Sequence, residues 1–136
     1  ICINGRQTYK KYQYRSNYLA VPCSKTPDWC FDCDENDRIT DLHKGGTNCA
    51  HMYGIGYYDK KTGDFFRKYV DEVFNHTLGG KDRFYDDVLC CFHNEEAEIY
   101  IRRCTFGDTM ESNSFEELCE ADERYRITNR DVYEAS

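Results

Sequence analysis

A stretch near the middle of the chain has the pattern of an amphipathic helix, and it constrains the fold more than any other stretch. Residues 64–78 (DFFRKYVDEVFNHTL) place apolar side chains on one stripe with a 3.6-residue period. Asp64 is in the position of an N-cap, and Gly79-Gly80 should end the helix because glycine accepts a left-handed backbone. A sheet should cover this stripe, which consists of Phe65, Phe66, Tyr69, Val70, Val73 and Phe74.

Nine cysteines are spread over nearly the whole of the 136 residues. So many cysteines in so short a chain are typical of secreted proteins, in which disulfides staple the fold. We therefore predict an extracellular protein with about four intramolecular disulfides. Their pairing stays open, and the ninth cysteine is either free or joins two chains in a disulfide-linked dimer. The predicted disulfide cysteines are Cys2, Cys23, Cys30, Cys33, Cys49, Cys90, Cys91, Cys104 and Cys119.

The length of 136 residues is that of one domain, so we expect residues 1–136 to form a single disulfide-rich unit. The chain begins at Ile1 rather than at methionine, which fits either the removal of a signal peptide or a trimmed chain. No apolar run approaches the length of a membrane span. Asn75-His76-Thr77 is an N-glycosylation sequon, which predicts a glycoprotein with its glycan at Asn75.

The net charge of −7 belongs to the C-terminal third of the chain. Residues 1–92 hold 13 basic and 13 acidic side chains, whereas residues 93–136 hold 5 basic and 12 acidic ones. Duplex nucleic acid and anionic membranes both attract a positive protein face. We therefore expect neither duplex binding nor membrane insertion, whereas a basic protein partner is allowed.

Several stretches alternate in the manner of β-strands. These are residues 8–15, 18–21 and 50–58, followed by a hairpin candidate formed by residues 86–92 and 97–104. Thr26-Pro27 should open a short helix, and Ser114 with Glu117 forms a capping box for a second long helix. The predicted fold is therefore α+β, with an antiparallel sheet of about four strands and two helices packed on one face, stapled by disulfides.

Two overlapping patterns around residue 33 contain potential metal ligands. Asp32-x-Asp34-x-Asn36 matches the first positions of a calcium loop, but the glycine and the terminal glutamate of such loops are missing. The alternative is a solvated acidic turn, and calcium binding there stays open. A zinc site would draw on Cys30, Cys33, Cys49 and His51. Because disulfides explain these cysteines better, we predict no metal and no cofactor.

The chain contains no nucleophile elbow, no zinc-protease motif and no phosphate loop. A small hydrolase acting on RNA needs little more than an acid, a base and a cation. The candidates are histidines 43, 51 and 93, glutamates 95, 96 and 98, and Arg102 and Arg103. Residues 9–15 fit a stacking strip for single strands, or an edge strand protected by lysines. No arrangement follows from these positions, so the catalytic residues stay unknown.

In its size, its cysteine number and its Ile1-Cys2 start, the chain resembles the small cysteine-rich effector proteins that pathogens and parasites secrete. The resemblance implies a virulence-type protein that acts by binding another macromolecule, such as a host receptor or defence protein. The high tyrosine content, 12 residues, suits protein recognition. We therefore expect a binding protein rather than an enzyme, with a small secreted hydrolase such as a ribonuclease as the alternative.

Overall fold

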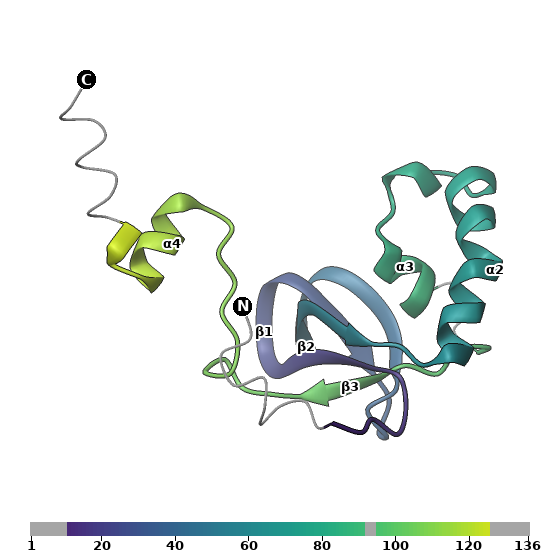
Figure 1. Ribbon diagram of the computed structural model, residues 1–136, viewed down its shortest axis with the longest axis horizontal. Helices are drawn as coiled ribbons and strands as arrows, with labels where there is room; N and C mark the ends of the chain where they lie inside the picture. Colours follow the sequence, from purple (N-terminus) through teal and green to yellow (C-terminus); the bar gives the residue numbers. More distant parts are fainter. Residues whose placement is uncertain (1–10, 92–94, 126–136) are drawn as a thin grey trace.

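The computed structural model of the chain describes residues 11–91 and 95–125. Figure 1 shows the order of elements, with α2 and α3 on one side of the sheet and α4 away from both. In the described residues the sheet has three strands in the order β2-β1-β3, antiparallel between β1 and β2 and parallel between β1 and β3. The elements are β1 (Asn17–Cys33), β2 (Ile39–Tyr57), α2 (Lys60–His76), the 3-10 helix η1 (Gly80–Asp82), α3 (Tyr85–Cys90), β3 (Tyr100–Arg103) and α4 (Phe115–Ala121).

The predicted fold class is wrong in two respects. The sheet is mixed rather than antiparallel, because β3 runs parallel to β1. The two expected helices do not share one face, since α4 lies apart from the face that α2 and α3 cover. A parallel pair cannot form a tight hairpin, so the chain must cross over between its two strands. It does so through β2, α2 and α3.

Strands β1 and β2 form one long, strongly bent hairpin. Cys30 and Phe31 pair with residues 42–43 on one side and with residues 50–51 on the other, because both strands fold back over themselves. The predicted helix start at Thr26 therefore lies inside a strand, where cross-strand pairing overrides the local preference. Of the predicted strand 8–15, residues 8–10 lie outside the described residues, and residues 11–15 are not in a strand.

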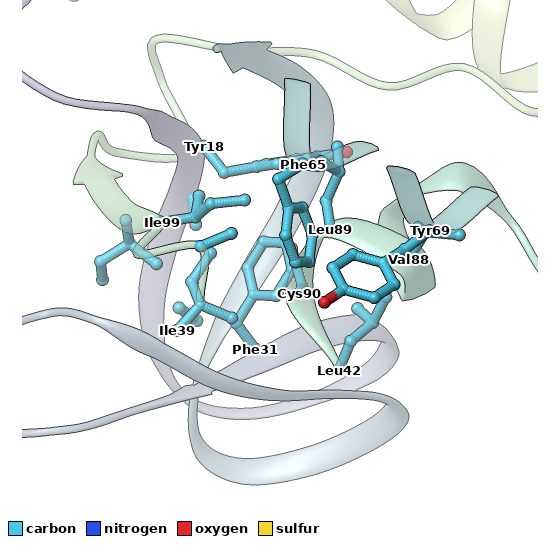
Figure 2. Packing of buried hydrophobic residues seen from close by; sticks show 14 of the residues in the cluster. Tyr18, Phe31, Ile39, Leu42, Phe65, Tyr69, Val88, Leu89, Cys90 and Ile99 are labelled. Atoms are coloured by element: carbon cyan, nitrogen blue, oxygen red, sulfur yellow. The ribbon is translucent and has the colours of Figure 1, made fainter. Parts of the chain in front are cut away.

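Helix α2 confirms the central helix that its apolar stripe predicts, although it begins earlier. Asp59 rather than Asp64 is the N-cap, and its side chain accepts a hydrogen bond of 2.8 Å from the Thr62 amide. The helix ends at His76 with Thr77 as an extended C-cap, before the glycine that was expected to end it; Gly79 has a left-handed φ of 71° and caps the start of η1. Phe65, Tyr69 and Val73 are buried against the sheet (Figure 2).

The expected hairpin of residues 86–92 and 97–104 is not formed. Residues 85–90 form helix α3 instead, and only residues 100–103 form a strand. Asp87 favours the helix because its carboxylate accepts a 3.1 Å hydrogen bond from the Phe84 amide at the helix start. Cys90 and Cys91 therefore do not project to opposite faces of a sheet.

The expected disulfide framework is also wrong for the described residues. All eight cysteines that the structure describes are free thiols, and Cys2 lies outside the described residues. Several are deeply buried, with Cys30 and Cys90 exposing 0% and 1% of their surface. They pack as small apolar side chains, which is a common use of reduced cysteine.

Candidate functional site

Three tyrosines and one aspartate meet where the sheet, α2 and α3 converge, and we call them the tyrosine–aspartate cluster: Tyr18, Tyr58, Tyr85 and Asp86. The Tyr18 hydroxyl donates to Asp86 Oδ1 at 3.0 Å and lies 3.4 Å from the Tyr85 hydroxyl oxygen. The rings of Tyr18 and Tyr58 are in edge contact, with centroids 6.5 Å apart. The cluster thus joins the start of β1, the residue after β2 and the first turn of α3.

Asp86 is a buried carboxylate, with 7% of its surface exposed. Burial raises its pKa above the ordinary carboxyl value, while hydrogen bonds from Tyr18 and Tyr85 act against that rise. Burial also raises the pKa values of Tyr18 and Tyr58, so both hydroxyls stay protonated at neutral pH. The carboxyl group of Asp86 therefore lies among neutral phenols.

The neighbouring Asp87 has a different role. Its carboxylate accepts from the Phe84 amide and pairs with Arg83 at 3.2 Å, so its charge is compensated within α3 and the residues just before it. Asp86, in contrast, forms no ion pair with any of the described residues, and its carboxylate accepts a hydrogen bond from Tyr18. Of the two carboxylates, Asp86 is therefore the one without a neighbouring cation in this part of the chain.

A cavity of about 330 Å³ opens beside the cluster. Its volume is in the range of small-molecule sites. Tyr58 and Tyr85 belong both to the cluster and to the cavity wall, and the Tyr58 hydroxyl has no hydrogen-bond partner in the described residues. The complete lining is Tyr58, Thr62, Gly63, Phe66, Tyr85 and Leu89.

Two further aromatic side chains, Phe84 and Trp29, are connected to the cavity wall through Tyr85. Phe84 directly precedes Tyr85, and its ring meets the edge of the Trp29 ring at 6.0 Å. Phe84 is 60% exposed and Tyr85 is 46% exposed, although both are large apolar side chains. Exposed aromatic side chains beside a cavity are typical of a binding surface.

The histidines that the sequence suggested as acid or base do not form a catalytic pair. His43 hydrogen-bonds to Asp32 and to the Gly45 carbonyl, and His51 to the Thr26 hydroxyl at 2.9 Å. His93 lies outside the described residues. The proposed cation Arg103 makes two hydrogen bonds to Asp37, so its charge is compensated.

The predicted acidic turn is a hydrogen-bonded turn. Asp34 Oδ1 accepts from the amides of Asn36 and Arg38, and Asp32 pairs with His43. Within residues 11–91 and 95–125, no three His, Cys, Asp or Glu side chains are gathered as ready metal ligands. The zinc grouping suggested by the sequence is also divided, since Cys33 packs against the core cluster and Cys30 does not.

Asn75 lies in the last turn of α2, where its side-chain amide donates to Asp71. Its glycosylation stays a prediction. None of the described helices is both long enough and apolar enough to cross a bilayer.

No protein-family model matches the chain. A 2-aminoethylphosphonate cytidylyltransferase of Lancefieldella rimae is 28% identical over 126 residues, which are 92% of this chain and 50% of that protein. The solved structure of the CTP:phosphocholine cytidylyltransferase from Streptococcus pneumoniae matches with a TM-score of 0.64 and 16% identity, over 82% of this chain and 48% of that one. The chain thus spans about half the length of each.

These similarities show the fold and correct the functional prediction. The fold is a Rossmann-like nucleotidyltransferase fold, in the part that this chain covers. Both similar proteins are cytidylyltransferases, which contradicts a virulence effector, a hydrolase and the expectation of a non-enzymatic protein. The predictions of an extracellular location and a host-protein partner rested on the cysteine count and the effector resemblance, and they stay untested.

Sequence reasoning missed the tyrosine–aspartate cluster. Tyr18 and Asp86 are 68 positions apart, and no short motif joins them. The pattern of residues 86–92 predicted a strand of a hairpin, so the carboxylates of Asp86 and Asp87 were not placed at a helix start. One local signal was present: two adjacent acidic residues after two aromatics fit the first turn of a helix next to a binding surface.

Proposed function

We propose that this chain forms the acceptor-binding part of a cytidylyltransferase that transfers a cytidylyl group from CTP to a small aminoalkyl phosphonate or phosphate. The similarity to two cytidylyltransferases supports the reaction class. The acceptors in the names of these two enzymes, 2-aminoethylphosphonate and phosphocholine, share a cationic nitrogen and an anionic phosphorus group. The observation that carries the proposal is the aromatic cavity beside Asp86, a carboxylate that forms no ion pair with any described residue.

A cavity with aromatic walls suits a cationic nitrogen. The faces of tyrosine and phenylalanine rings attract ammonium groups, by about 0.5–2 kcal/mol depending on desolvation. Tyr58, Phe66 and Tyr85 supply such rings around the cavity. Asp86, the next residue of α3 after Tyr85, adds a negative potential. The site therefore favours an ammonium head over a neutral alkyl group of the same size.

The reaction requires the acceptor to be bound by its ammonium end, so that its phosphonate end is free to react. A phosphonate oxygen forms a bond to the α-phosphorus of CTP, and the bond from that phosphorus to the bridging oxygen breaks. Pyrophosphate leaves with the electron pair. In transfers of this kind the protein contributes mainly position and charge. This chain's contribution is to fix the acceptor by its ammonium end, so that the phosphonate points away from the cavity.

The single tryptophan of the chain allows a direct binding test, because Trp29 touches Phe84 at the edge of the site. We expect 2-aminoethylphosphonate and phosphocholine to change its fluorescence. Ethylphosphonate, which lacks only the amino group, should bind about tenfold more weakly, since the cation–aromatic attraction is lost. Equal affinity for the amino and the amino-free compounds would contradict the proposal.

Matched variants locate the binding. Tyr85→Leu keeps an apolar wall but removes a ring, so it should weaken binding of 2-aminoethylphosphonate by about tenfold. Phe74→Leu removes an exposed ring from α2 that does not line the cavity, and it should have no effect. Turnover is followed by ³¹P NMR with CTP, Mg²⁺ and the acceptor, using the protein that contains this chain. Transfer from UTP as fast as from CTP would refute the cytidylyl assignment.

A further inference from the structure

A second group of reactive side chains lies on the opposite face of the β1–β2 hairpin. We call Cys23, Cys30, His43 and Cys49 the thiol–imidazole cluster. Alternate residues of a strand face opposite sides of the sheet. Phe31 and Ala50 belong to the core beneath α2 and α3, so their neighbours Cys30 and Cys49 face the other way. The cluster is therefore separate from the cavity and from the proposed acceptor site.

Strand pairing brings the four side chains together. Cys23 pairs with Cys49, and Cys30 pairs with His43. Cys49 lies between the other two cysteines: it is the cross-strand partner of Cys23, and its sulfur and that of Cys30 both lie next to Gly46, so the three thiols form a row. Cys30 and Cys49 are 0% and 6% exposed, which places the row in a largely dry environment.

One pair within the cluster has the spacing of two ligands on one tetrahedral zinc ion. Cys30 Sγ lies 3.7 Å from His43 Nδ1. Zinc binds thiolate sulfur at about 2.3 Å and imidazole nitrogen at about 2.05 Å, which puts two tetrahedral ligands roughly 3.6 Å apart. This pair therefore needs almost no adjustment to share a metal.

Three of the four side chains converge beside Gly46. A Cβ at this position would lie 2.8 Å from His43 Cε1, 3.0 Å from Cys30 Sγ and 3.1 Å from Cys49 Sγ. These contacts are too short for a methyl group, so any side chain would force the cluster apart. The glycine does not have a positive φ, which means that its role is to leave room rather than to make a turn.

Asp32 already holds the ring of His43 in one orientation. The Nε2 of His43 pairs with Asp32 at 3.2 Å, an arrangement in which a carboxylate fixes the ring of a metal-binding histidine. The other nitrogen, Nδ1, lies 2.9 Å from the Gly45 carbonyl oxygen and 3.7 Å from Cys30 Sγ. A metal at the cluster would replace the proton on Nδ1.

We propose that the thiol–imidazole cluster is a zinc site, with Cys23, Cys30, Cys49 and His43 as ligands and Asp32 as the residue that positions His43. In the described residues the ligands are not yet gathered at metal–ligand distances. Binding therefore turns the Cys23 and Cys49 thiols toward the space beside Gly46. Two ligands come from each strand, so the ion stabilises the hairpin on the face that α2 and α3 do not cover.

The test uses Co²⁺ as a spectroscopic probe on the fully reduced protein, followed by displacement with Zn²⁺. We expect one equivalent of Co²⁺ to give the visible bands of tetrahedral coordination and thiolate charge-transfer absorption, and Zn²⁺ to abolish both. Cys23→Ser, Cys30→Ser and Cys49→Ser should each weaken binding by at least about tenfold. Cys33→Ser and Cys91→Ser, which alter thiols packed against the core, are the matched controls and should bind normally.

Two variants keep all four ligands and test the geometry. Gly46→Ala should abolish binding because its methyl group occupies the space between the ligands, whereas Gly63→Ala, where a Cβ meets only one distant atom, should not. Asp32→Asn should weaken binding by about 10- to 100-fold. Octahedral Co²⁺ spectra, absence of binding by the folded wild-type chain, or equal losses in Cys33→Ser would overturn the proposal. None of these readouts depends on nucleotidyl transfer.

Discussion

The two faces of the β1–β2 hairpin are buried to a similar extent but in different ways. Toward α2 and α3, Tyr18 and Phe31 are fully buried among aromatic and aliphatic side chains (Figure 2). On the other face, Cys30 and His51 are 0% and 7% exposed, and they are not part of that core cluster. Helices α2 and α3 cover the first face, whereas side chains that hydrogen-bond to one another cover the second.

This difference decides what each face can bind. The aromatic rings of the first face attract an ammonium group weakly and in a defined direction. The carboxylate of Asp86 lies beside them. A face of thiols and imidazoles offers soft ligands but little apolar packing. It gains stability from a metal that replaces the missing packing. The same hairpin thus serves two different chemistries through the alternation of its side chains.

The largest effect is expected from the aromatic face. Phe31 is 0% exposed, and its ring meets that of Tyr18 at 4.9 Å. Phe31→Ala should lower the free energy of unfolding by about 3–5 kcal/mol, because it leaves a cavity in the core. Urea denaturation in the presence of a chelator measures this loss.

The adjacent Cys30→Ala is the matched comparison for the other face. It removes one sulfur atom from a face without large apolar packing, so in the same chelated conditions it should cost about 1 kcal/mol. A loss as large as that of Phe31→Ala would show that both faces are stabilised by packing, and the contrast between them would fail.

The next effect concerns the buried carboxylate. Tyr18→Phe keeps the ring in the core but removes the hydroxyl that donates to Asp86 at 3.0 Å. A buried acceptor that loses its donor costs about 1–3 kcal/mol, so we expect a loss of stability in that range. Tyr57→Phe, at an exposed tyrosine at the end of β2, is the control. Equal losses in both variants would mean that Asp86 does not depend on Tyr18.

The sequence predicts the elements that form these faces only where apolar residues recur at a clear helical or strand period. Helix α2 follows from its stripe, because six large apolar residues at a helical period have no other use. Residues 86–92 were misread, because a short apolar run fits a strand and a buried helix turn equally well. Asp87 decides in favour of the helix, because its carboxylate accepts a hydrogen bond from the Phe84 amide. That contact exists only in the folded helix.

The cysteines were misread for a different reason. Their number predicts disulfides only if the thiols are oxidised, and the described ones are reduced and packed. The sequence grouped Cys30 with Cys33 because they are three positions apart. The strand separates them, since Cys33 packs against the core and Cys30 faces the other side. The cross-strand partner of Cys23, Cys49, depends on a register that composition does not contain.

A smaller effect is the dependence of stability on pH, which should differ between the two faces. Burial raises the pKa of Asp86 in the folded protein, so folding favours its protonated form. Stability should therefore fall as the pH rises from about 3.9, the ordinary carboxyl value, through the raised folded value. Asp86→Asn keeps an oxygen for Tyr18 and removes this dependence, so at neutral pH it should be more stable than the wild type by about 1 kcal/mol. Denaturation curves across the acidic range test this, and parallel pH profiles for both proteins would refute it.

The smallest effect belongs to the thiol–imidazole face and occupies a different pH window. The hydrogen bond to Asp32 raises the pKa of His43 in the folded protein, so this pair stabilises the fold below about pH 6.5. The contribution is lost as the pH rises through the raised value. His43→Gln should therefore cost about 0.2–1 kcal/mol near pH 6 and almost nothing at higher pH, measured with chelator present.

Adding Zn²⁺ should reverse the sign of this dependence. The metal needs a neutral Nδ1 on His43 and deprotonated thiols, and burial raises the pKa values of Cys23, Cys30 and Cys49. The stability contributed by zinc should then increase with pH, while that contributed by the Asp32–His43 pair decreases. Thermal unfolding at several pH values, with chelator and with Zn²⁺, compares the two. If zinc stabilised the protein equally at every pH, its ligands would not be these thiols, and the contrast between the two faces would rest on packing alone.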